Sequence, residues 1–350
     1  MYKSLFIVIL ILLSILTPHC YVIKQGYYQL EQVSQSETLS KALANPNIPN
    51  NIKVKIVLVA DVKRFAVKEL GLTDHDNYNH YIPIQGNYVV YNLSASRKDQ
   101  LKPVIWTFPI VGRVPYLGFF KLQDAKTTQK ELQEKGYDTL LRGVSAYSTL
   151  GFFKDPLFST MTRYKEESLI NVIIHEMVHG TIFIRNDVKF NEALATFIGN
   201  KGTLLFLEKK YGSNKKWIER AKKDDHDDLL FSHFMKEMIK GVNAFYNRPI
   251  PQQEKIKKRG AIYKKYQTLF EKTIVPKLKT KKYQHFPKIK LNNALILSFR
   301  RYYYDLTLFE KVFHHMDNDI KKTITFFKLI ENTKLKPKKA ILHWLKAQKK

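Results

Sequence analysis

The sequence predicts an α+β fold, in which a small sheet with helices forms the N-terminal half and a mainly helical half follows. Three observations support this. Short aromatic and β-branched runs bounded by Gly and Pro lie between residues 78 and 120. Beyond about residue 160, apolar residues recur at helical spacing almost to the end. No flexible linker interrupts the chain, so we expect residues 21–350 to form one domain, with an α+β part at 21–158 and a helical part at 159–350.

The composition is that of a folded chain with a sizeable core. Of 350 residues, 44% are hydrophobic and 13% are aromatic, which excludes a mainly disordered protein. The single cysteine, Cys20, excludes an intrachain disulfide and a cysteine-rich zinc knuckle. A metal site in this chain must therefore use histidines and carboxylates.

The first twenty residues have the pattern of an export signal. One lysine precedes the apolar run Leu5–Leu16, which is shorter than the roughly 20 residues of a membrane-spanning helix. Such a run after a short basic start is typical of exported proteins, so we expect residues 1–20 to direct the chain to the cell envelope. Cys20 stands where a bacterial lipoprotein carries its lipidated cysteine. Lipidation at Cys20, cleaved secretion and an uncleaved anchor are the alternatives.

Residues 21–70 carry a mainly helical pattern, broken by the Pro- and Asn-rich stretch Asn45–Pro49. Apolar residues in Ile52–Leu70 recur at the spacing of one helix face, and Gly71 ends the pattern. The β-branched start of this segment, Val54–Val59, also fits a strand. We therefore expect two helical segments, with a strand at 54–59 as the alternative.

The clearest strands of the predicted sheet are Tyr88–Leu93 and Val104–Phe108, each bounded by Gly or Pro. A helix is predicted at Gln123–Lys135, and a short strand or extended segment at Leu140–Tyr147. The helical half is expected to contain helices at 163–183, 190–211 and 214–247, followed by further amphipathic stretches.

Positive charge is concentrated near the C-terminus. The chain holds 59 Lys and Arg against 31 Asp and Glu, a net charge of +28, and residues 251–350 alone hold 26 against 7. This excess fits a solvated, lysine-rich set of helix surfaces, or a basic face for an anionic membrane surface. No nucleic-acid-binding module is recognisable, so no specific nucleic-acid partner is expected.

One segment of the helical half has the residues for metal chemistry. Leu169–Gly180 has apolar flanks and contains His175, Glu176 and His179. Because residues four apart project from the same face of a helix, the two imidazoles can bind one zinc ion. Glu176 is turned about 100° from His175, so it lies beside the ion and can act as general base for the attacking water.

A third zinc ligand is expected from the next helix. The short loop Ile184–Asp187 separates two helical patterns, so the second helix can fold back on the first. Glu192 lies in its first turn, and two histidines with one carboxylate form a catalytic zinc set that keeps one position open. The alternative is an amphipathic helix whose His and Glu side chains face solvent. The apolar flanks argue against it, because burying these groups without a ligand is costly.

HExxH followed by an NExxA helix resembles the gluzincin arrangement of thermolysin-like and alanyl-aminopeptidase-like metallopeptidases. From about Cys20 to Phe313 the chain is more closely similar to a bacterial family of lipoprotein-like zinc aminopeptidases. The resemblance implies a single zinc-dependent peptidase domain in the cell envelope, with peptides as substrates. Besides the HExxH helix, it is carried by the blocks Gly26–Tyr28, Trp106–Gly112, Pro115–Phe120, Gly136–Asp138, Ala146–Pro156, Asp187–Glu192 and Leu291–Ala294.

The chain departs from the better-known gluzincins at two places. The thermolysin pattern has an Asp four residues after its glutamate ligand to orient a histidine, and Thr196 stands there in this chain. Asp187, Asn191 or a backbone carbonyl are the candidates for orienting the ligands instead. Alanyl-type aminopeptidases hold the substrate amine with an acid near the substrate-binding strand, but Ala146–Gly151 contains none. Aminopeptidase and endopeptidase action are therefore both open.

Candidate substrate contacts come from two further segments. Tyr147, Ser148, Thr149 and Gly151 precede the HExxH helix by about 25 residues and are expected to form an edge strand that pairs with the substrate backbone, with an ordinary buried turn as the alternative. Asn292 and Asn293, in the last resembling block, are also candidate substrate contacts.

A hydroxyl donor for the oxyanion is expected from Tyr302, Tyr303 or Tyr304. Adjacent residues on a helix point in different directions, so at most one of them can serve, and Tyr302 fits the family pattern. Packing is the alternative for this residue.

The sequence thus predicts a zinc-dependent peptidase of the cell envelope, with one zinc ion and an aminopeptidase as the specific form. The alternatives are a catalytically silent metal-binding envelope protein and a basic protein that binds membrane surfaces.

Overall fold

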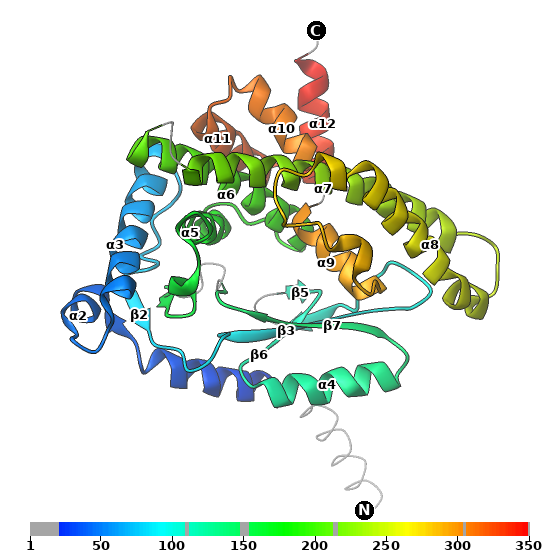
Figure 1. Cartoon of the computed structure of the whole chain (residues 1–350), viewed down its shortest axis with the longest axis horizontal. Coiled ribbons are helices and arrows are strands. Elements are labelled where there is room, and N and C mark those ends of the chain that lie inside the picture. Colours follow the sequence, from blue (N-terminus) through cyan, green and yellow to red (C-terminus); the bar gives the residue numbers. More distant parts are fainter. Residues whose placement is uncertain (1–20, 109–111, 148–153, 213–215, 304–305, 349–350) are drawn as a thin grey trace, which may run out of the picture.

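The α+β fold is confirmed by the computed structural model, which describes residues 21–108, 112–147, 154–212, 216–303 and 306–348 (Figure 1). Its N-terminal part is mainly helical with the expected break at Asn45–Pro49, but the first of the two expected segments is divided by β1 into helical residues 21–33 and α2. Val54–Val59 lies inside the second expected segment, so the strand alternative is wrong. The elements are β1 (Glu37–Thr38), α2 (Leu39–Ala44), α3 (Asn50–Phe65) and the π-helical turn η1 (Ala66–Leu70).

The strands of the described residues form three small sheets. The central one has the order β6-β3-β7 and is antiparallel, so β7 lies at its edge, and the other two pair β1-β2-β8 and β4-β5. The strands are β2 (His80–Ile82), β3 (Val90–Ser96), β4 (Trp106–Phe108), β5 (Gly112–Val114), β6 (Leu117–Phe119), β7 (Asp138–Val144) and β8 (Leu157–Phe158).

Helices cover both faces of the central sheet. α4 (Leu122–Glu134) packs on one face, and α9 (Asn293–Tyr303) packs on the other, which is also the side of α5 (Figure 1). The predicted helix at Gln123–Lys135 and the predicted strand at Leu140–Tyr147 correspond to α4 and β7.

The second half is helical, as predicted, and α5 lies at its centre. Leu169, Ile170, Ile173 and Ile174 of α5 are all fully buried, because this helix is surrounded by α3, α6 and the sheet side of the molecule. The helices are α5 (Glu166–Thr181), α6 (Val188–Tyr211), α7 (Lys216–Tyr246), α8 (Gln252–Thr273), α10 (Leu306–His315), α11 (Ile320–Glu331) and α12 (Pro337–Ala347), with short turns η2 (Met161–Arg163), η3 (Val275–Lys277) and η4 (Phe286–Lys288).

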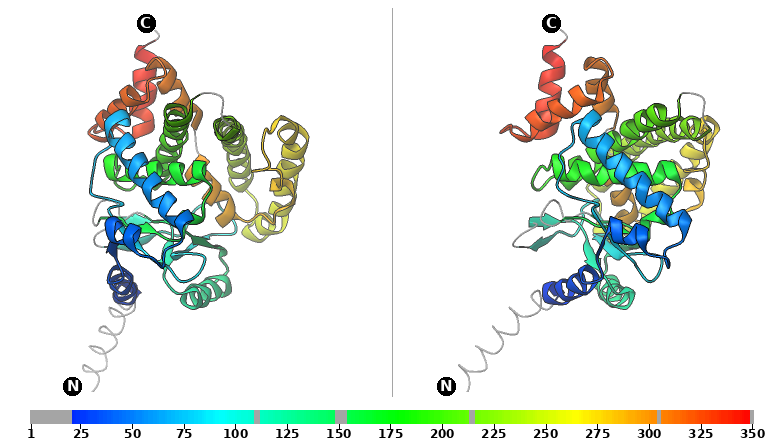
Figure 2. Two further views of the ribbon diagram at one scale, coloured as in Figure 1. Left: turned by 60° about the vertical axis from the view of Figure 1, so that its left-hand side comes forward. Right: turned by 90° about the vertical axis from the view of Figure 1, so that its left-hand side faces the viewer.

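The helix-rich C-terminal part has two regions. α10 and α11 pack on α6, and α12 packs on α11, at the end of the molecule opposite to residues 21–33 (Figures 1 and 2). α8 packs against α7 through an aromatic core around Phe231, whose ring stacks on Tyr283 at 4.1 Å.

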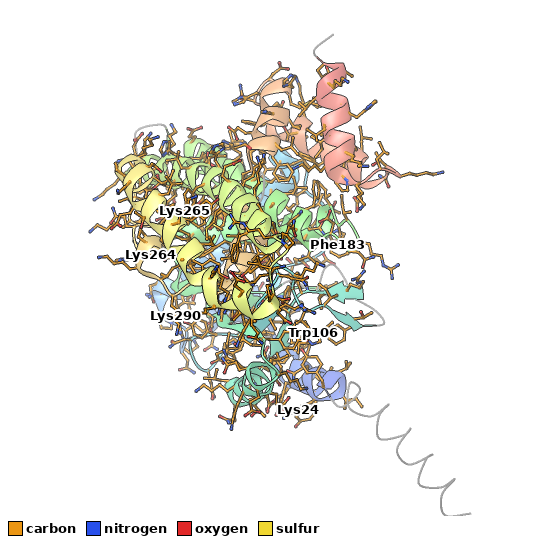
Figure 3. The ribbon with its side chains drawn as sticks, turned by 90° about the vertical axis from the view of Figure 1, so that its right-hand side faces the viewer. Lys24, Trp106, Phe183, Lys264, Lys265 and Lys290 are labelled. Atoms are coloured by element: carbon orange, nitrogen blue, oxygen red, sulfur yellow. The ribbon has the colours of Figure 1, made fainter. Side chains whose placement is uncertain are left out.

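The lysine-rich segments lie on different sides of the molecule. Lys264 and Lys265 of α8 and Lys290 are exposed on one side (Figure 3), whereas α12 projects at the far end. This distribution favours solvated helix surfaces over one continuous basic face. Within the described ranges, no helix combines the length and the apolar character required to cross a bilayer.

Two glycines of α6 allow this helix to approach α5 closely. A Cβ atom at Gly202 would lie 2.9 Å from Leu70 Cδ1 and 3.1 Å from Ile174 Cδ1, and one at Gly199 would lie 3.3 Å from Asn171 Nδ2. Packing this tight leaves no room for a methyl group unless the buried side chains of Leu70 and Ile174, or the helices themselves, shift.

We therefore predict that Gly202→Ala destabilises the protein, by about 1–3 kcal/mol, because the fully packed side chains of Leu70 and Ile174 must leave their positions or α6 must move. Gly260→Ala in α8 is the matched control. Its Cβ would meet nothing within 4 Å, so the better helix propensity of Ala should raise stability by about 0.5–1 kcal/mol. Urea unfolding midpoints measure both changes. Equal stabilisation of the two variants would contradict the close approach of α5 and α6.

Candidate active site

α5 presents His175 and His179 on one face. The two residues are four apart in a regular helix, and their rings lie 4.9 Å apart between centroids. Their side chains are 14% and 6% exposed, so both imidazoles are largely shielded from solvent. The apolar residues that bury the rest of α5 also hold these two side chains in place.

Glu192 reaches the two histidines because α6 folds back along α5. The Asn191 amide bonds both backbone groups of Ile184, at 3.0 Å to its N–H and 2.9 Å to its carbonyl. Asp187 caps α6 by accepting from the N–H of Phe190 at 3.2 Å. Asp187 and Asn191 thus position the first turn of α6. In the part of the chain that the structure describes, neither side chain bonds an imidazole.

The connection between α5 and α6 is also held from the C-terminal part. Glu331, the last residue of α11, accepts a hydrogen bond from the backbone N–H of Phe183 at 3.0 Å. Phe190 of α6 packs edge-on against Phe327 of α11, with ring centroids 6.3 Å apart. The first turn of α6 is therefore supported by residues far away in the sequence.

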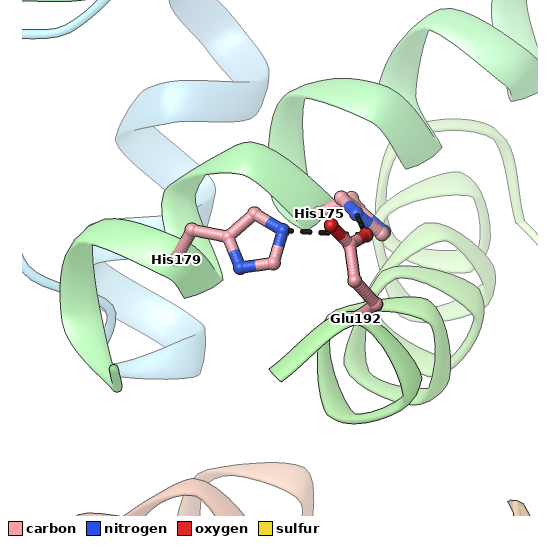
Figure 4. A group of neighbouring side chains, drawn as sticks. All are labelled: His175, His179 and Glu192. Atoms are coloured by element: carbon pink, nitrogen blue, oxygen red, sulfur yellow. Dashed lines mark ion pairs between the residues drawn. The ribbon is translucent and has the colours of Figure 1, made fainter. Parts of the chain in front are cut away.

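The three side chains converge on one point (Figure 4). Glu192 Oε2 lies 3.4 Å from His175 Nε2 and 3.7 Å from His179 Nε2, and one ligand atom from each residue lies within 4.8 Å of the others. Ligand atoms around a tetrahedral ion, with bonds of about 2.0–2.1 Å, are separated by roughly 3.3 Å. Geometry and donor chemistry therefore fit a divalent metal ion bound by two nitrogens and one oxygen.

Charge in this cluster is shared between the carboxylate and the imidazoles. Burial raises the pKa of Glu192, but hydrogen bonds from His175 and His179 outweigh it and hold that pKa far below its usual value. Burial lowers the pKa of His179, but its bond to Glu192 raises it more. The carboxylate is thus ionised, as a metal ligand must be. His179 Nδ1 is buried and has no hydrogen-bond partner among the described residues.

Glu176 follows His175 on α5 and lines the same cleft, which has a volume of about 840 Å³. Glu176 is not one of the three residues whose ligand atoms converge in the His–Glu cluster. Burial raises its pKa from the ordinary value of a glutamate, although the two nearby histidines act in the opposite direction. A buried carboxyl group with a raised pKa is suited to exchanging protons near neutral pH.

Two tyrosines, Tyr302 and Tyr116, line the cleft beside the cluster. The Tyr302 ring lies 6.4 Å from the His175 ring, and its hydroxyl accepts a hydrogen bond from Arg142 Nη2 at 3.2 Å. Burial is the main cause that raises the pKa of Tyr302, so its hydroxyl stays protonated. Tyr303 also lines the cleft.

The second tyrosine of the site, Tyr116, was not singled out from the sequence. Burial, and then the charge of Glu192, raise its pKa, and the guanidinium of Arg301 lies 4.8 Å from its ring centroid. Tyr116 belongs to the block Pro115–Phe120, so the resemblance contained the only signal that could have identified it.

Tyr147 lines the cleft too, and packs on Phe158 at 5.2 Å and Phe120 at 6.1 Å between ring centroids. The other residues predicted with it, Ser148, Thr149 and Gly151, lie outside the described residues, as does Cys20.

Asn292 and Asn293 have a different role from the predicted substrate contact. Neither lines the cleft. Asn292 Nδ2 donates to the carbonyl of Thr139 at 3.1 Å, and fully buried Asn293 joins α9 to the strand side of the fold. The structure uses their amide groups within the fold. Asn293 donates to the carbonyls of Arg97, Lys98 and Gln100 and accepts from the hydroxyls of Tyr246 and Tyr263.

The fold and the cluster together define an α+β protein with a buried His–Glu site that opens to a cleft. The family model described as "Putative aminopeptidase" matches residues 20–342, so the chain belongs to this Aminopep family. No curated protein and no solved structure matches the chain. The family name supports a peptidase, and the matched range contains every residue of the cluster.

We predict that Asn293→Ala lowers the free energy of unfolding by about 3 kcal/mol, because it leaves several buried polar groups without partners. Asn332→Ala, at an exposed position after α11, is the control, with an expected change of less than about 0.5 kcal/mol. Urea unfolding measures both. If Asn293→Ala kept wild-type stability, the structural role of this amide would be wrong.

Proposed function

We propose that this protein is a zinc-dependent peptidase, with the aminopeptidase as the specific form that the family name supports. One observation carries the proposal. His175, His179 and Glu192 converge within 4.8 Å, and Glu176 stands beside them in the same cleft. This is the residue set that hydrolysis of a peptide bond at a metal centre requires.

His175 Nε2, His179 Nε2 and a carboxylate oxygen of Glu192 are the proposed zinc ligands. When bound, zinc would act as a Lewis acid on the substrate carbonyl and increase the acidity of water. The site has no cysteine and three N and O donors, which suits a catalytic rather than a structural zinc site.

Glu176 is the proposed general base. It takes one proton from the attacking water as the carbon–oxygen bond forms, and it gives this proton to the leaving amine as the carbon–nitrogen bond breaks. Its raised pKa, caused mainly by burial, lowers the cost of holding the proton between these two steps. The same buried position keeps the carboxyl group close to the metal ligands.

Tyr302 is the proposed donor to the oxyanion. Its hydroxyl accepts from Arg142, so its own proton is free to point into the cleft. Peptide substrates are proposed to lie along β7, the edge strand of the central sheet, whose continuation includes Tyr147.

We predict that Glu176→Gln binds one zinc ion per chain but loses at least about 10³-fold in kcat, because the amide cannot accept the proton. His179→Ala, which removes a ligand, should lose both zinc and activity. Metal analysis and cleavage of a mixed peptide library, with products identified by mass, measure both. Removal of single N-terminal residues identifies an aminopeptidase, and internal cleavage an endopeptidase.

Wild-type turnover by Glu176→Gln would contradict the general base. A wild-type protein that binds zinc but cleaves no peptide would favour the catalytically silent metal-binding protein instead.

We also propose that the protein is exported and held at the cell envelope through its N-terminus. Helical residues 21–33 directly follow the predicted export segment and leave a row of apolar side chains in solvent. Ile23, Tyr27 and Leu30 are 70%, 65% and 71% exposed. The spacing of these residues puts them along one side of the helix, where they can enter the same bilayer as a lipid on Cys20.

For this proposal we predict that full-length protein expressed in a bacterial host sediments with membranes. Combining Cys20→Ser with Ile23→Glu and Leu30→Glu should release it, because the lipid and the apolar row are both lost. Val54→Glu, at another exposed apolar position (67%), is the control and should leave it in the membrane fraction. Release of wild-type protein by a salt wash would argue against the anchor.

A further inference from the structure

Arg142 projects from β7 into the cleft that holds the His–Glu cluster. Alternate residues of β7, Leu140, Arg142 and Val144, line this cleft, as expected for one face of a strand. Directly opposite Arg142 on β3 is Asn92, which lines the cleft as well. A cation and an amide therefore stand side by side on the sheet surface that faces the metal ligands.

Arg142 is the only Lys or Arg among the described residues that line this cleft, and no carboxylate of the described residues lies within ion-pair distance of it. Arg259, in contrast, is neutralised, because it bonds both oxygens of Asp138 at 2.5 and 3.0 Å. Arg142 has one hydrogen bond, to Tyr302, although a guanidinium offers five donors. Its charge and most of its donors are therefore available to a ligand.

Arg142 lies a short distance from the histidines at which the peptide bond would be cleaved. Its guanidinium carbon lies 5.4 Å from the centre of the Tyr302 ring, and that ring lies 6.4 Å from the ring of His175. An extended peptide advances about 3.3 Å per residue. A group bound by Arg142 would thus belong to a residue within about three positions of the cleaved bond.

Resting on the proposed peptidase function, we propose that Arg142 and Asn92 bind a carboxylate of the peptide substrate. The planar guanidinium matches the two oxygens of a carboxylate, and the Asn92 amide adds a neutral donor. Apart from Glu176 and Glu192, no carboxylate lines the described part of this cleft, so no further acidic side chain of the lining competes for Arg142.

Two sources can supply this carboxylate. It can be the C-terminal carboxylate of a short peptide, which makes the protein an enzyme of di- to tetrapeptides, or the side chain of an Asp or Glu residue near the cleaved bond. Both have the same chemistry, and substrates of matched length distinguish them.

The test compares kcat/KM of the zinc-loaded wild-type enzyme for three peptides: trialanine, trialanine amide and Ala-Glu-Ala amide. We expect kcat/KM for trialanine to be at least about tenfold higher than for its amide, mostly through a lower KM, because the amide cannot form an ion pair with the guanidinium. A preference for Ala-Glu-Ala amide over trialanine amide would assign the subsite to acidic side chains. Equal values for all three peptides would overturn the proposal.

Variants separate carboxylate binding from an effect on Tyr302. Arg142→Gln should reduce the ratio between trialanine and its amide to about one, and Arg142→Lys should retain part of it. Tyr302→Phe should lower kcat for both peptides and keep the ratio. Arg64→Gln removes an exposed arginine of α3 that pairs with Asp61, and it should leave the ratio unchanged. If Arg142→Gln lowers kcat/KM for both peptides by the same factor, Arg142 only positions Tyr302 and the proposal fails.

Binding provides an arm that does not depend on turnover. Titration calorimetry measures Kd for trialanine and for its amide. Zinc-loaded Glu176→Gln should bind trialanine about tenfold more tightly than the amide, and the double variant with Arg142→Gln should bind the two peptides equally. If the zinc-loaded wild-type protein cleaves no peptide of the mixed library but this discrimination is present, the carboxylate subsite is supported and the peptidase proposal fails. Equal binding of both peptides would overturn the subsite.

Discussion

The packing of α6 against α5 is the constraint on which the candidate site depends. α5 supplies two imidazoles and α6 supplies the carboxylate, so their separation decides whether three ligand atoms can share one ion. Gly199 and Gly202 allow the close approach along the helices, and Asn191 and Asp187 determine where α6 begins. The connection between the helices and the packing along them thus both determine how far the ligand atoms of His175, His179 and Glu192 lie from one another.

The cleft combines two environments that favour different chemistry. On the helix side, burial raises the pKa of Glu176, whereas hydrogen bonds from the two histidines outweigh burial and keep Glu192 ionised. On the sheet side, Arg142 and Asn92 face the same space from β7 and β3. Tyr302 of α9 connects the two, because it contacts Arg142 and faces His175. A substrate in this cleft would be oriented by the sheet and would react at the helices.

The sequence was most informative where local spacing determines geometry. The spacing of His175 and His179, and the short loop before Glu192, were enough to predict their convergence, because helix periodicity and a tight connection leave few arrangements. It was least informative where the partners are distant. Asn292 and Asn293 were expected to contact substrate, but the carbonyls they bind lie some 150–200 residues away in the chain. Arg142 and Tyr116 had no local signal, since only the pairing of β7 with β3 and the packing of α9 give them a place in the cleft.

Glu331 and Phe327 of α11 support the connection between α5 and α6, although they belong to the last stretch of the chain. During synthesis, the HExxH helix and Glu192 leave the ribosome well before this support exists. A nascent or C-terminally truncated chain would therefore hold its ligands less firmly than the finished one. The His–Glu cluster would thus reach its final geometry only after the terminal helices have folded onto α6.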